Sequence, residues 1–378
     1  KFAQALWMTK SMRYAAYTPD RTAEFEQVIK EHGAQLNNHT RNLGGMGLAI
    51  LESGGPQHPR GVALYYGSPA GGHSHHDRLN IEFFDRWQSV MPDLGYPDQW
   101  GAKAQQFTQN SIGHYSVLVD EQGETDYLAG YLDFIKGSEG VQVVSARAER
   151  CFPGTSLYRR ETALVDLSPE SCYLFDVFRV RGGKQHDWCF HLPPVPDWSL
   201  EGVTLSEPGK GTLAGDDVPE GGTWDANNGF NWLAHPQRGK PCDPQGRPGE
   251  FTLTAKANPP YPELRMTMLS GCADEVIVGD HESPRVKANL PQYMKWLLAR
   301  HKGEANLSSA FGAVIDTSGS GAPRAIQGVR RLAATGGTEP VAATIKTAAY
   351  TDTVVSDETG EKPITLGDGT TLQGRWAM

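Results

Sequence analysis

The sequence predicts a mainly β protein: an antiparallel, multilayer β-sandwich preceded by a short segment of two helices. Three observations lead to this prediction. The 378 residues include 43 Gly and 25 Pro, a content typical of many turns. From Gly47 onward, apolar residues alternate with polar ones, which is the period of a half-buried strand. Helical spacing, in contrast, is confined to the first 40 residues.

Two domains are therefore expected, a helical segment over residues 1–40 and a β-sandwich domain over residues 41–378. The first helix is predicted over residues 2–17 and the second over residues 20–32. Asp20 is placed to cap the second helix, and Gly33 to end it.

Short strands separated by turn residues are predicted along the rest of the chain. They cover residues 48–50, 62–64, 79–83, 115–119, 141–148, 157–165, 172–180, 251–255, 264–269, 275–278, 294–300, 311–315 and 342–347. That many strands without intervening helices favours stacked antiparallel sheets. The last residues, 372–378, keep strand character, so the chain is expected to end inside its natural domain.

Residues 194–248 are dense in Pro, Gly, Asp and Trp and are predicted to form long loops over a sheet. Three tryptophans in this region either face a ligand or pack against the sheet: Trp198, Trp224 and Trp232.

Charge and cysteine content exclude some classes of protein. The net charge of −9 argues against non-specific nucleic-acid binding, but local basic residues can still hold a polyanion. No apolar run approaches the ~20 residues that span a bilayer, so no membrane segment is predicted. The five cysteines contain no CxxC pair, which predicts mostly buried free thiols.

Histidines and a carboxylate are spread over three segments that a folded sheet could bring together. His73 and His75 lie two residues apart and project from the same face of an extended segment, whereas His76 projects from the other. Asp93 follows the strand predicted over residues 79–83, and His114 precedes the one that starts at Tyr115. Two imidazoles and one carboxylate suit zinc with an open fourth position. The residues alone leave a second interpretation open, in which they are ordinary polar groups at turns.

Several ordered motifs resemble the β-domain of the heparinase II/III-like polysaccharide lyases, from residue 41 to about 200 with weaker traces beyond. They are Gly72-His73-Ser74-His75-His76-Asp77-Arg78-Leu79-Asn80, Pro92-Asp93-Leu94-Gly95-Tyr96, His114-Tyr115-Ser116-Val117-Leu118-Val119-Asp120, Tyr158-Arg159-Arg160 and the run from Asp176 to Gly183.

The resemblance implies a role for each matching residue. His73 matches the family's catalytic histidine, and the zinc ligands match His75, Asp93 and His114. The implied reaction is β-elimination on an anionic, uronic-acid-containing polysaccharide of glycosaminoglycan or alginate type, in the periplasm or outside the cell. Whether zinc acts in catalysis or only fixes the structure stays open, with the structural role favoured.

Members of this family carry a helical toroid before the sandwich, and the helices of residues 2–32 resemble its last piece. The toroid supplies the tyrosine that shuttles protons and groups that bind the uronate carboxylate, none of which can be placed in this chain. The resemblance therefore implies a partner, either a separate toroid chain or a cleaved one.

Two arginines are candidates for binding the polyanion. Arg159 and Arg160 alternate faces on one strand, so at most one faces a cleft, and each is equally well explained as a solvated or salt-bridged strand residue.

Two further functions stay open. One is a non-catalytic carbohydrate-binding or structural sandwich. The other is a zinc hydrolase with Glu82 as general base, a role that the alternation of Glu82 relative to the histidine face does not support.

Overall fold

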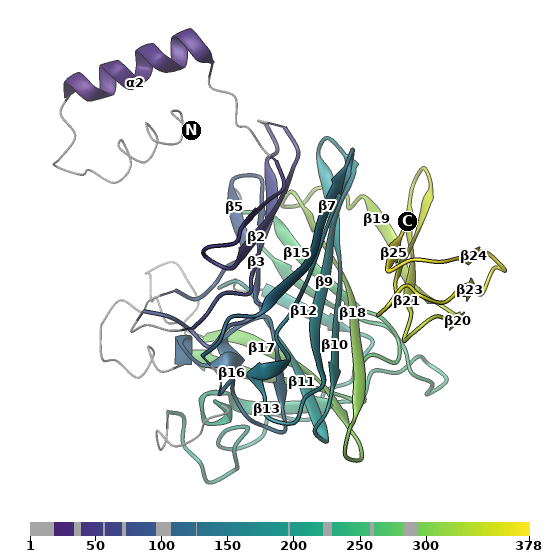
Figure 1. Ribbon diagram of the computed structural model, residues 1–378. Coiled ribbons are helices and arrows are strands. Elements are labelled where there is room, and N and C mark those ends of the chain that lie inside the picture. The colour runs from purple at the N-terminus through teal and green to yellow at the C-terminus, as the bar shows by residue number, and fades with distance from the viewer. Residues whose placement is uncertain are drawn as a thin grey trace.

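The computed structural model describes residues 19–33, 39–55, 57–69, 73–95, 107–125, 127–195, 197–221, 229–257, 261–282 and 293–378. Within them, antiparallel strands dominate and one α-helix longer than a turn is present, near the N-terminus (Figure 1). This confirms the predicted fold class. No helix in the described ranges is long and apolar enough to cross a membrane.

The helix α2 spans Pro19–His32 and confirms the second predicted helix. It begins one residue earlier than expected, so Asp20 lies in its first turn rather than at the cap. Gly33 has φ 79° and its N–H donates to the carbonyl of Ile29 at 2.8 Å, which ends the helix as predicted. The helix predicted over residues 2–17 lies outside the described residues.

The first sheet has the order β1-β2-β3-β4-β5 and follows the chain as a meander. Its strands are β1 (Arg41–Leu43), β2 (Leu48–Ser53), β3 (Arg60–Tyr65), β4 (Ile81–Asp85) and β5 (Gln88–Met91). Along β4, buried and exposed residues alternate strictly, so Ile81 and Phe83 face the core and the opposite face points outward. Leu79, predicted to begin this strand, lies instead in a turn with φ 63°.

An eight-stranded and a five-stranded sheet form the central sandwich. The larger has the order β12-β14-β15-β18-β10-β9-β8-β7 and the smaller β13-β16-β17-β11-β6. Their bounds are β6 (Val117–Val119), β7 (Tyr131–Ser138), β8 (Val141–Arg147), β9 (Leu157–Ser168), β10 (Ser171–Arg181), β11 (Gln185–His191), β12 (Asp197–Glu201), β13 (Ala234–Gly239), β14 (Phe251–Lys256), β15 (Glu263–Met268), β16 (Glu275–Glu282), β17 (Tyr293–Lys302) and β18 (Ser308–Ser318).

The layers explain which strands are buried on both faces. Every residue of β10 except the two at its ends is buried, because other sheets cover both sides of the larger sheet. One core cluster joins Phe178 of β10, Trp188 of β11 and Leu64 of β3. The first sheet therefore packs against the outer side of the sandwich, where β2 contacts β8 and β9.

Two small sheets close the C-terminal end of the chain. They have the orders β19-β21-β22-β25 and β20-β23-β24. Their bounds are β19 (Ile326–Leu332), β20 (Ala334–Gly336), β21 (Val341–Thr347), β22 (Thr351–Ser356), β23 (Ile364–Leu366), β24 (Thr371–Leu372) and β25 (Trp376–Ala377). Arg179 of β10 ties them to the sandwich by donating to the hydroxyl of Ser356 at 2.9 Å and to its carbonyl at 2.8 Å.

The region predicted as long loops is more ordered than expected. Residues 194–248 contain β12, the 3₁₀ turn η3 (Phe230–Trp232) and β13. Trp232 is buried in a second core cluster, and Trp198 packs on the main core with the ammonium of Lys295 5.3 Å from its ring centroid. These two tryptophans therefore pack, whereas Trp224 lies outside the described residues. The thiol prediction is confirmed, since all five cysteines are free and only Cys242 is exposed.

Candidate metal centre

Four side chains from three segments converge at one end of the first sheet. His75 and Asp77 come from the segment before β4, and Asp93 follows β5. His114 ends the 3₁₀ turn η1 (Ser111–Gly113), which Asn110 caps by accepting a hydrogen bond from the Ile112 N–H at 3.2 Å. Pairing of β4 with β5 brings the first two segments together, and the third comes from the turn before β6, a strand of another sheet. His75, Asp77, Asp93 and His114 are called the metal group below.

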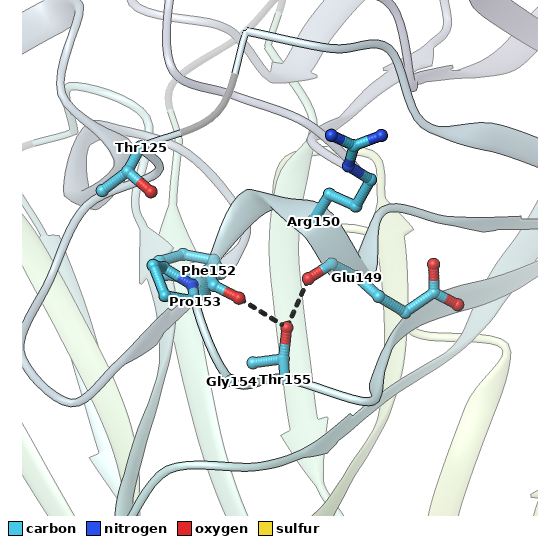
Figure 2. A pocket seen from close by; sticks show the side chains of 7 residues that line it. All are labelled: Thr125, Glu149, Arg150, Phe152, Pro153, Gly154 and Thr155. Carbon is cyan, nitrogen blue, oxygen red and sulfur yellow. Dashed lines mark hydrogen bonds between the residues drawn. The ribbon is translucent and has the colours of Figure 1, made fainter.

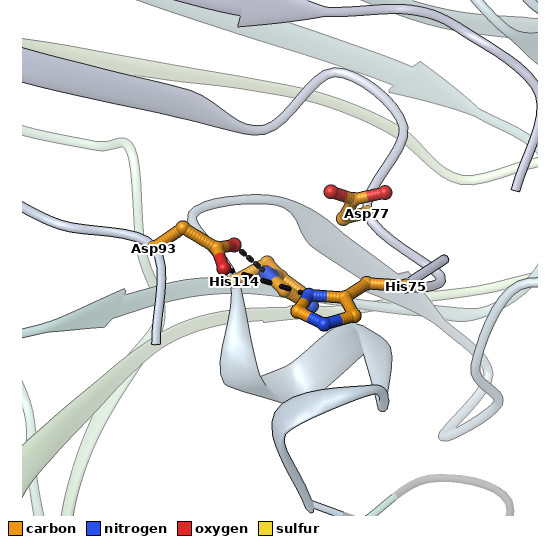
Figure 3. A group of neighbouring side chains, drawn as sticks. All are labelled: His75, Asp77, Asp93 and His114. Atoms are coloured by element: carbon orange, nitrogen blue, oxygen red, sulfur yellow. Dashed lines mark ion pairs between the residues drawn. The ribbon is translucent and has the colours of Figure 1, made fainter. Parts of the chain in front are cut away.

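The metal group is compact. One ligand atom from each residue lies within 4.8 Å of the others. Asp93 faces both imidazoles, with its carboxylate oxygens 2.9 Å from Nδ1 of His114 and 3.5 Å from Nδ1 of His75 (Figure 3). The ring centroids of the two histidines are 5.2 Å apart. The structure therefore brings together all three residues that the sequence singled out as ligands.

The polar atoms of the metal group fit a divalent cation. Nδ1 of His114 faces the Asp93 carboxylate, whereas Nε2 of His114 and Oδ1 of Asp77 are buried and have no hydrogen-bond partner among the described residues. Buried polar atoms without partners are rare and call for an explanation such as a bound ion. Two imidazoles and two carboxylates form a ligand set that suits zinc.

The two carboxylates differ in their electrostatics. Burial alone would raise the pKa of Asp93, but the rings of His114 and His75 outweigh it and hold that pKa well below its usual range. Burial, reinforced by the carboxylates of Glu124 and Asp93, raises the pKa of Asp77 well above its usual range. The histidines therefore favour the ionised form of Asp93, whereas burial and the neighbouring carboxylates favour the protonated form of Asp77.

Hydrogen bonds behind the metal group hold its segments in register. Asn80 accepts from the Tyr115 N–H at 3.0 Å and donates to Asp93 Oδ2 at 3.4 Å. Arg160 donates to the carbonyl of Leu79 at 2.9 Å and also to that of Tyr115. Asn80 and Arg160 therefore join the segments that carry the ligands, as outer partners of metal sites commonly do.

The two arginines lie apart from any open surface beside the metal group. Arg160 is fully buried, and its guanidinium forms a two-pronged ion pair with Asp176 at 2.8 and 2.7 Å. Arg159 points to the other face of β9, where it pairs with Asp133 at 3.0 Å and donates to the carbonyl of Glu358 at 2.9 Å. The predicted substrate role does not fit Arg160, because stacked sheets enclose its side chain.

His73, the predicted catalytic residue, is exposed and lies two residues before His75. It is not among the four converging side chains. Its catalytic role stays a prediction.

Two residues near the metal group were missed or misjudged from the sequence. Asp77 lies two residues after His75, so the same alternation that linked His73 to His75 could have found it. The alternation of Glu82 relative to the histidine face gives it little support as a general base, yet its carboxylate accepts the Asp93 N–H and lies close enough to His75 to interact with it.

A separate cavity of about 570 Å³ lies beside the turn η2 (Glu149–Cys151) and contains no member of the metal group. Its lining residues are Thr125, Glu149, Arg150, Phe152, Pro153, Gly154 and Thr155 (Figure 2). Thr155 donates to the carbonyl of Phe152 at 2.9 Å, which stabilises the turn itself. These contacts favour a structural role for this wall.

Solved structures with a similar fold are heparan sulfate lyases and heparinases. Heparinase III, the BT4657 gene product, has a TM-score of 0.53 at 11% identity, covering 94% of this chain and 48% of its own. Heparan sulfate lyase HepC from Pedobacter heparinus has a TM-score of 0.51 at 11% identity, with the same coverage. The chain thus spans about half the length of these structures, and identities this low show the fold alone.

Sequence comparison identifies the family directly. No curated protein matches the chain in sequence. The family described as Heparinase II/III-like, C-terminal, matches residues 37–268, which is more than half of the chain and includes the whole metal group. The chain therefore belongs to the heparinase II/III-like family and carries its C-terminal β-domain.

Proposed function

We propose that this chain is the β-domain of a zinc-containing polysaccharide lyase that cleaves a uronic-acid-containing polysaccharide by β-elimination. The observation that carries the proposal is the convergence of His75, Asp93 and His114 on one point within a heparinase II/III-like domain. His75, Asp77, Asp93 and His114 would hold the zinc. When bound, zinc supplies positive charge that neutralises the two carboxylates and fixes the segment that carries His73.

The reaction requires removal of a weakly acidic proton. A base takes the proton from C5 of the uronate, the electron pair forms the C4–C5 double bond, and the bond from C4 to the leaving oxygen breaks. Charge that develops on the uronate carboxylate needs donors aimed at it, and one such donor contributes roughly 3 to 4 kcal/mol. The exposed imidazole of His73 can take the proton, or it can donate a hydrogen bond that stabilises the developing charge.

The complete activity is proposed for the assembled protein. Because the chain spans 48% of the length of heparinase III, a helical toroid, as a separate or cleaved chain, would complete the cleft and supply the remaining proton carrier. For a substrate of glycosaminoglycan or alginate type, we propose a location in the periplasm or outside the cell.

One observation favours a second function, metal-assisted hydrolysis. Glu82 lies against Asp93 and close to His75, where a general base for a metal-bound water would stand. The two reactions leave different products, because elimination forms an unsaturated sugar and hydrolysis does not.

The test follows both products with one set of proteins. The zinc-loaded chain, alone and with its toroid partner, is incubated with uronate polysaccharides while ultraviolet absorbance and reducing ends are recorded. We expect absorbance to rise with the wild-type protein and not with His73→Ala, which should keep its zinc. New reducing ends without a rise in absorbance would contradict elimination and support hydrolysis. Polysaccharide binding without either product would support a carbohydrate-binding module.

A further inference from the structure

The outer face of the first sheet leads from the metal group to a tight hairpin and carries two exposed aromatic side chains. Glu82 and Phe84 both point outward from β4, and Glu82 contacts Asp93 at the end nearer the metal group. Trp87 lies in the hairpin that joins β4 to β5 and is 54% exposed, whereas Phe84 is 37% exposed. Alternate strand residues are about 7 Å apart, so this row extends away from the metal group along β4.

The backbone of this hairpin is strained at Arg86 and Trp87. Arg86 and Trp87 have φ of 53° and 65° and form the two-residue turn between the paired residues Asp85 and Gln88. Gly and Asn adopt this left-handed conformation readily, whereas bulky residues do so at a steric cost. About half of the Trp87 residue is exposed, so its side chain is only partly packed. Strain that persists in this way is typical of functional positions.

The hairpin is held rigidly in place. The Arg86 N–H donates to the carbonyl of Pro59 at 3.0 Å, and its guanidinium donates to that of Glu170 at 2.6 Å. Thr317 of β18 donates to Asp85 Oδ2 at 2.6 Å. Trp87 is therefore presented on a turn whose geometry is fixed before a ligand arrives, which lowers the entropy lost on binding.

A shallow cavity of about 390 Å³ lies beside these aromatic residues. We call it the β4 groove, and its lining includes Ile50, Glu52, Ala63, Glu82, Phe84 and Trp87. Ala63 pairs with both Ile50 and Glu82 across the sheet, and Gly61, opposite Phe84, contributes no side chain. The groove thus has an apolar floor, an aromatic wall and two carboxylates.

The charges in the β4 groove disfavour an anionic ligand. Its one basic lining residue among those described, Arg60, is buried and donates to Asp166 at 3.1 Å and to the carbonyl of Ser171 at 2.7 Å. The Glu52 carboxylate pairs with Arg41, so the negative charge facing a ligand comes mainly from Glu82. That carboxylate disfavours a sulfate or a uronate beside it and can accept hydrogen bonds from hydroxyl groups.

We propose that the β4 groove is a subsite that stacks the apolar face of an uncharged sugar ring on Trp87 and Phe84. The inference rests on the proposed function, since it assumes that a polysaccharide runs from the metal group along β4. The substrate class is then a polymer in which uncharged, unsulfated sugars alternate with uronates, in preference to a polymer of uronates alone. Stacking on the ring faces supplies the attraction and the acidic walls supply the selection.

The test measures binding separately from turnover. The full chain, wild type and Trp87→Gly, is titrated calorimetrically with two polymers, an unsulfated alternating glucuronate and N-acetylglucosamine polymer and a polymannuronate. We expect Trp87→Gly to bind the alternating polymer about tenfold more weakly and the polymannuronate within twofold of wild type. Its thermal midpoint should equal or exceed that of wild type, because glycine tolerates φ 65°.

Control variants distinguish an effect of the β4 groove from an effect of removing any exposed aromatic side chain. Tyr293→Ala removes an aromatic side chain that is 42% exposed on β17, in a different sheet, and should bind both polymers as wild type does. Phe84→Ser, which leaves the hairpin intact, should weaken binding of the alternating polymer in the same direction as Trp87→Gly.

The outcomes distinguish the subsite from the lyase activity. Unchanged binding by Trp87→Gly, equal loss for both polymers, or no binding of the alternating polymer by wild type would each overturn the subsite. A toroid chain that dissociates from Trp87→Gly while sugar binding stays unchanged would overturn it too and assign the groove to a protein interface. Selective weakening without any unsaturated product would support the subsite and contradict the proposed elimination.

Discussion

Two largely buried polar clusters are neighbours in the structure, because Arg160 of the first binds the segments that carry the second. They differ in how many of their buried polar atoms have hydrogen-bond partners. The first cluster consists of Arg160, Asp176 and Thr162. Both carboxylate oxygens of Asp176 and all three guanidinium nitrogens of Arg160 have hydrogen-bond partners. In the second, the metal group, His114 and Asp77 keep buried atoms without hydrogen bonds among the described residues. A fully satisfied buried network is structural, whereas an unsatisfied one points to a ligand from outside the chain.

The largest expected effect comes from breaking the satisfied cluster. Arg160→Met leaves the Asp176 carboxylate buried without its partner, which should destabilise the protein by about 3 to 5 kcal/mol in urea unfolding. The matched control is Arg330→Met, whose ion pair with Glu250 is on the surface and should contribute less than about 1 kcal/mol. Equal unfolding midpoints for the two variants would contradict the distinction between the clusters.

A smaller effect is expected from a histidine that packs behind the metal group. His191 stacks on Tyr115, and burial lowers the pKa of His191 to about 4. An unfolded histidine has a pKa of about 6.5, so the unfolded chain binds more protons between these values, and stability falls as the pH decreases from about 6.5 to about 4. The loss approaches roughly 3 kcal/mol below that window.

His191→Phe tests this dependence, because phenylalanine keeps the ring and removes the proton site. Urea unfolding with a chelator present should give a flatter decline between pH 6.5 and pH 4 than wild type gives. The same slope in both proteins would exclude His191 as the source of the decline.

The third prediction concerns the unsatisfied group. Zinc at a hundredfold excess over its dissociation constant should stabilise wild type by about 2.7 kcal/mol relative to the chelated protein. His75→Ala and Asp93→Ala should lose both this increment and bound zinc, measured by elemental analysis. His73→Ala should keep both, since His73 is not part of the metal group. Zinc retained by His75→Ala would refute the ligand assignment.

The smallest expected effect concerns the residue that joins the ligand segments. Asn80→Ala removes hydrogen bonds to Tyr115 and Asp93 without removing a ligand, and should weaken zinc binding by roughly 10- to 100-fold in competition with a chelating dye. Asn42→Ala is the control, because Asn42 accepts a hydrogen bond from the Tyr66 hydroxyl in the same sheet and should leave zinc affinity unchanged. Equal affinities in both variants would limit Asn80 to a structural role.

The fold was largely predictable because alternation of apolar and polar residues is a local property. Strands such as β3 and β4 bury one face and show it clearly. The strand β11 was missed because all of Gln185–His191 is buried, polar residues included, so no alternation marks it. Burial of both faces arises from the stacking of sheets, which a local pattern does not report.

The sequence motifs predicted which residues form the candidate site, but they did not predict which neighbouring side chains are buried by packing. The motifs pointed to His75, Asp93 and His114, and the structure brings them together. Alternation correctly placed Arg159 and Arg160 on opposite faces of β9. It could not tell that Leu79 and Tyr115 cover one of those faces, because these residues come from other parts of the chain.

The ligands of the metal group come from three segments, two at the ends of paired strands of the first sheet and one before β6 of another sheet. An ion held by all three acts as a removable cross-link that closes successive loops, in the way that a disulfide restricts a denatured chain. Its removal should therefore first raise hydrogen exchange at the backbone amides of η1 and β6, while β9 and β10 in the centre of the sandwich stay protected. Metal supply would then set how long this end of the first sheet survives proteolysis.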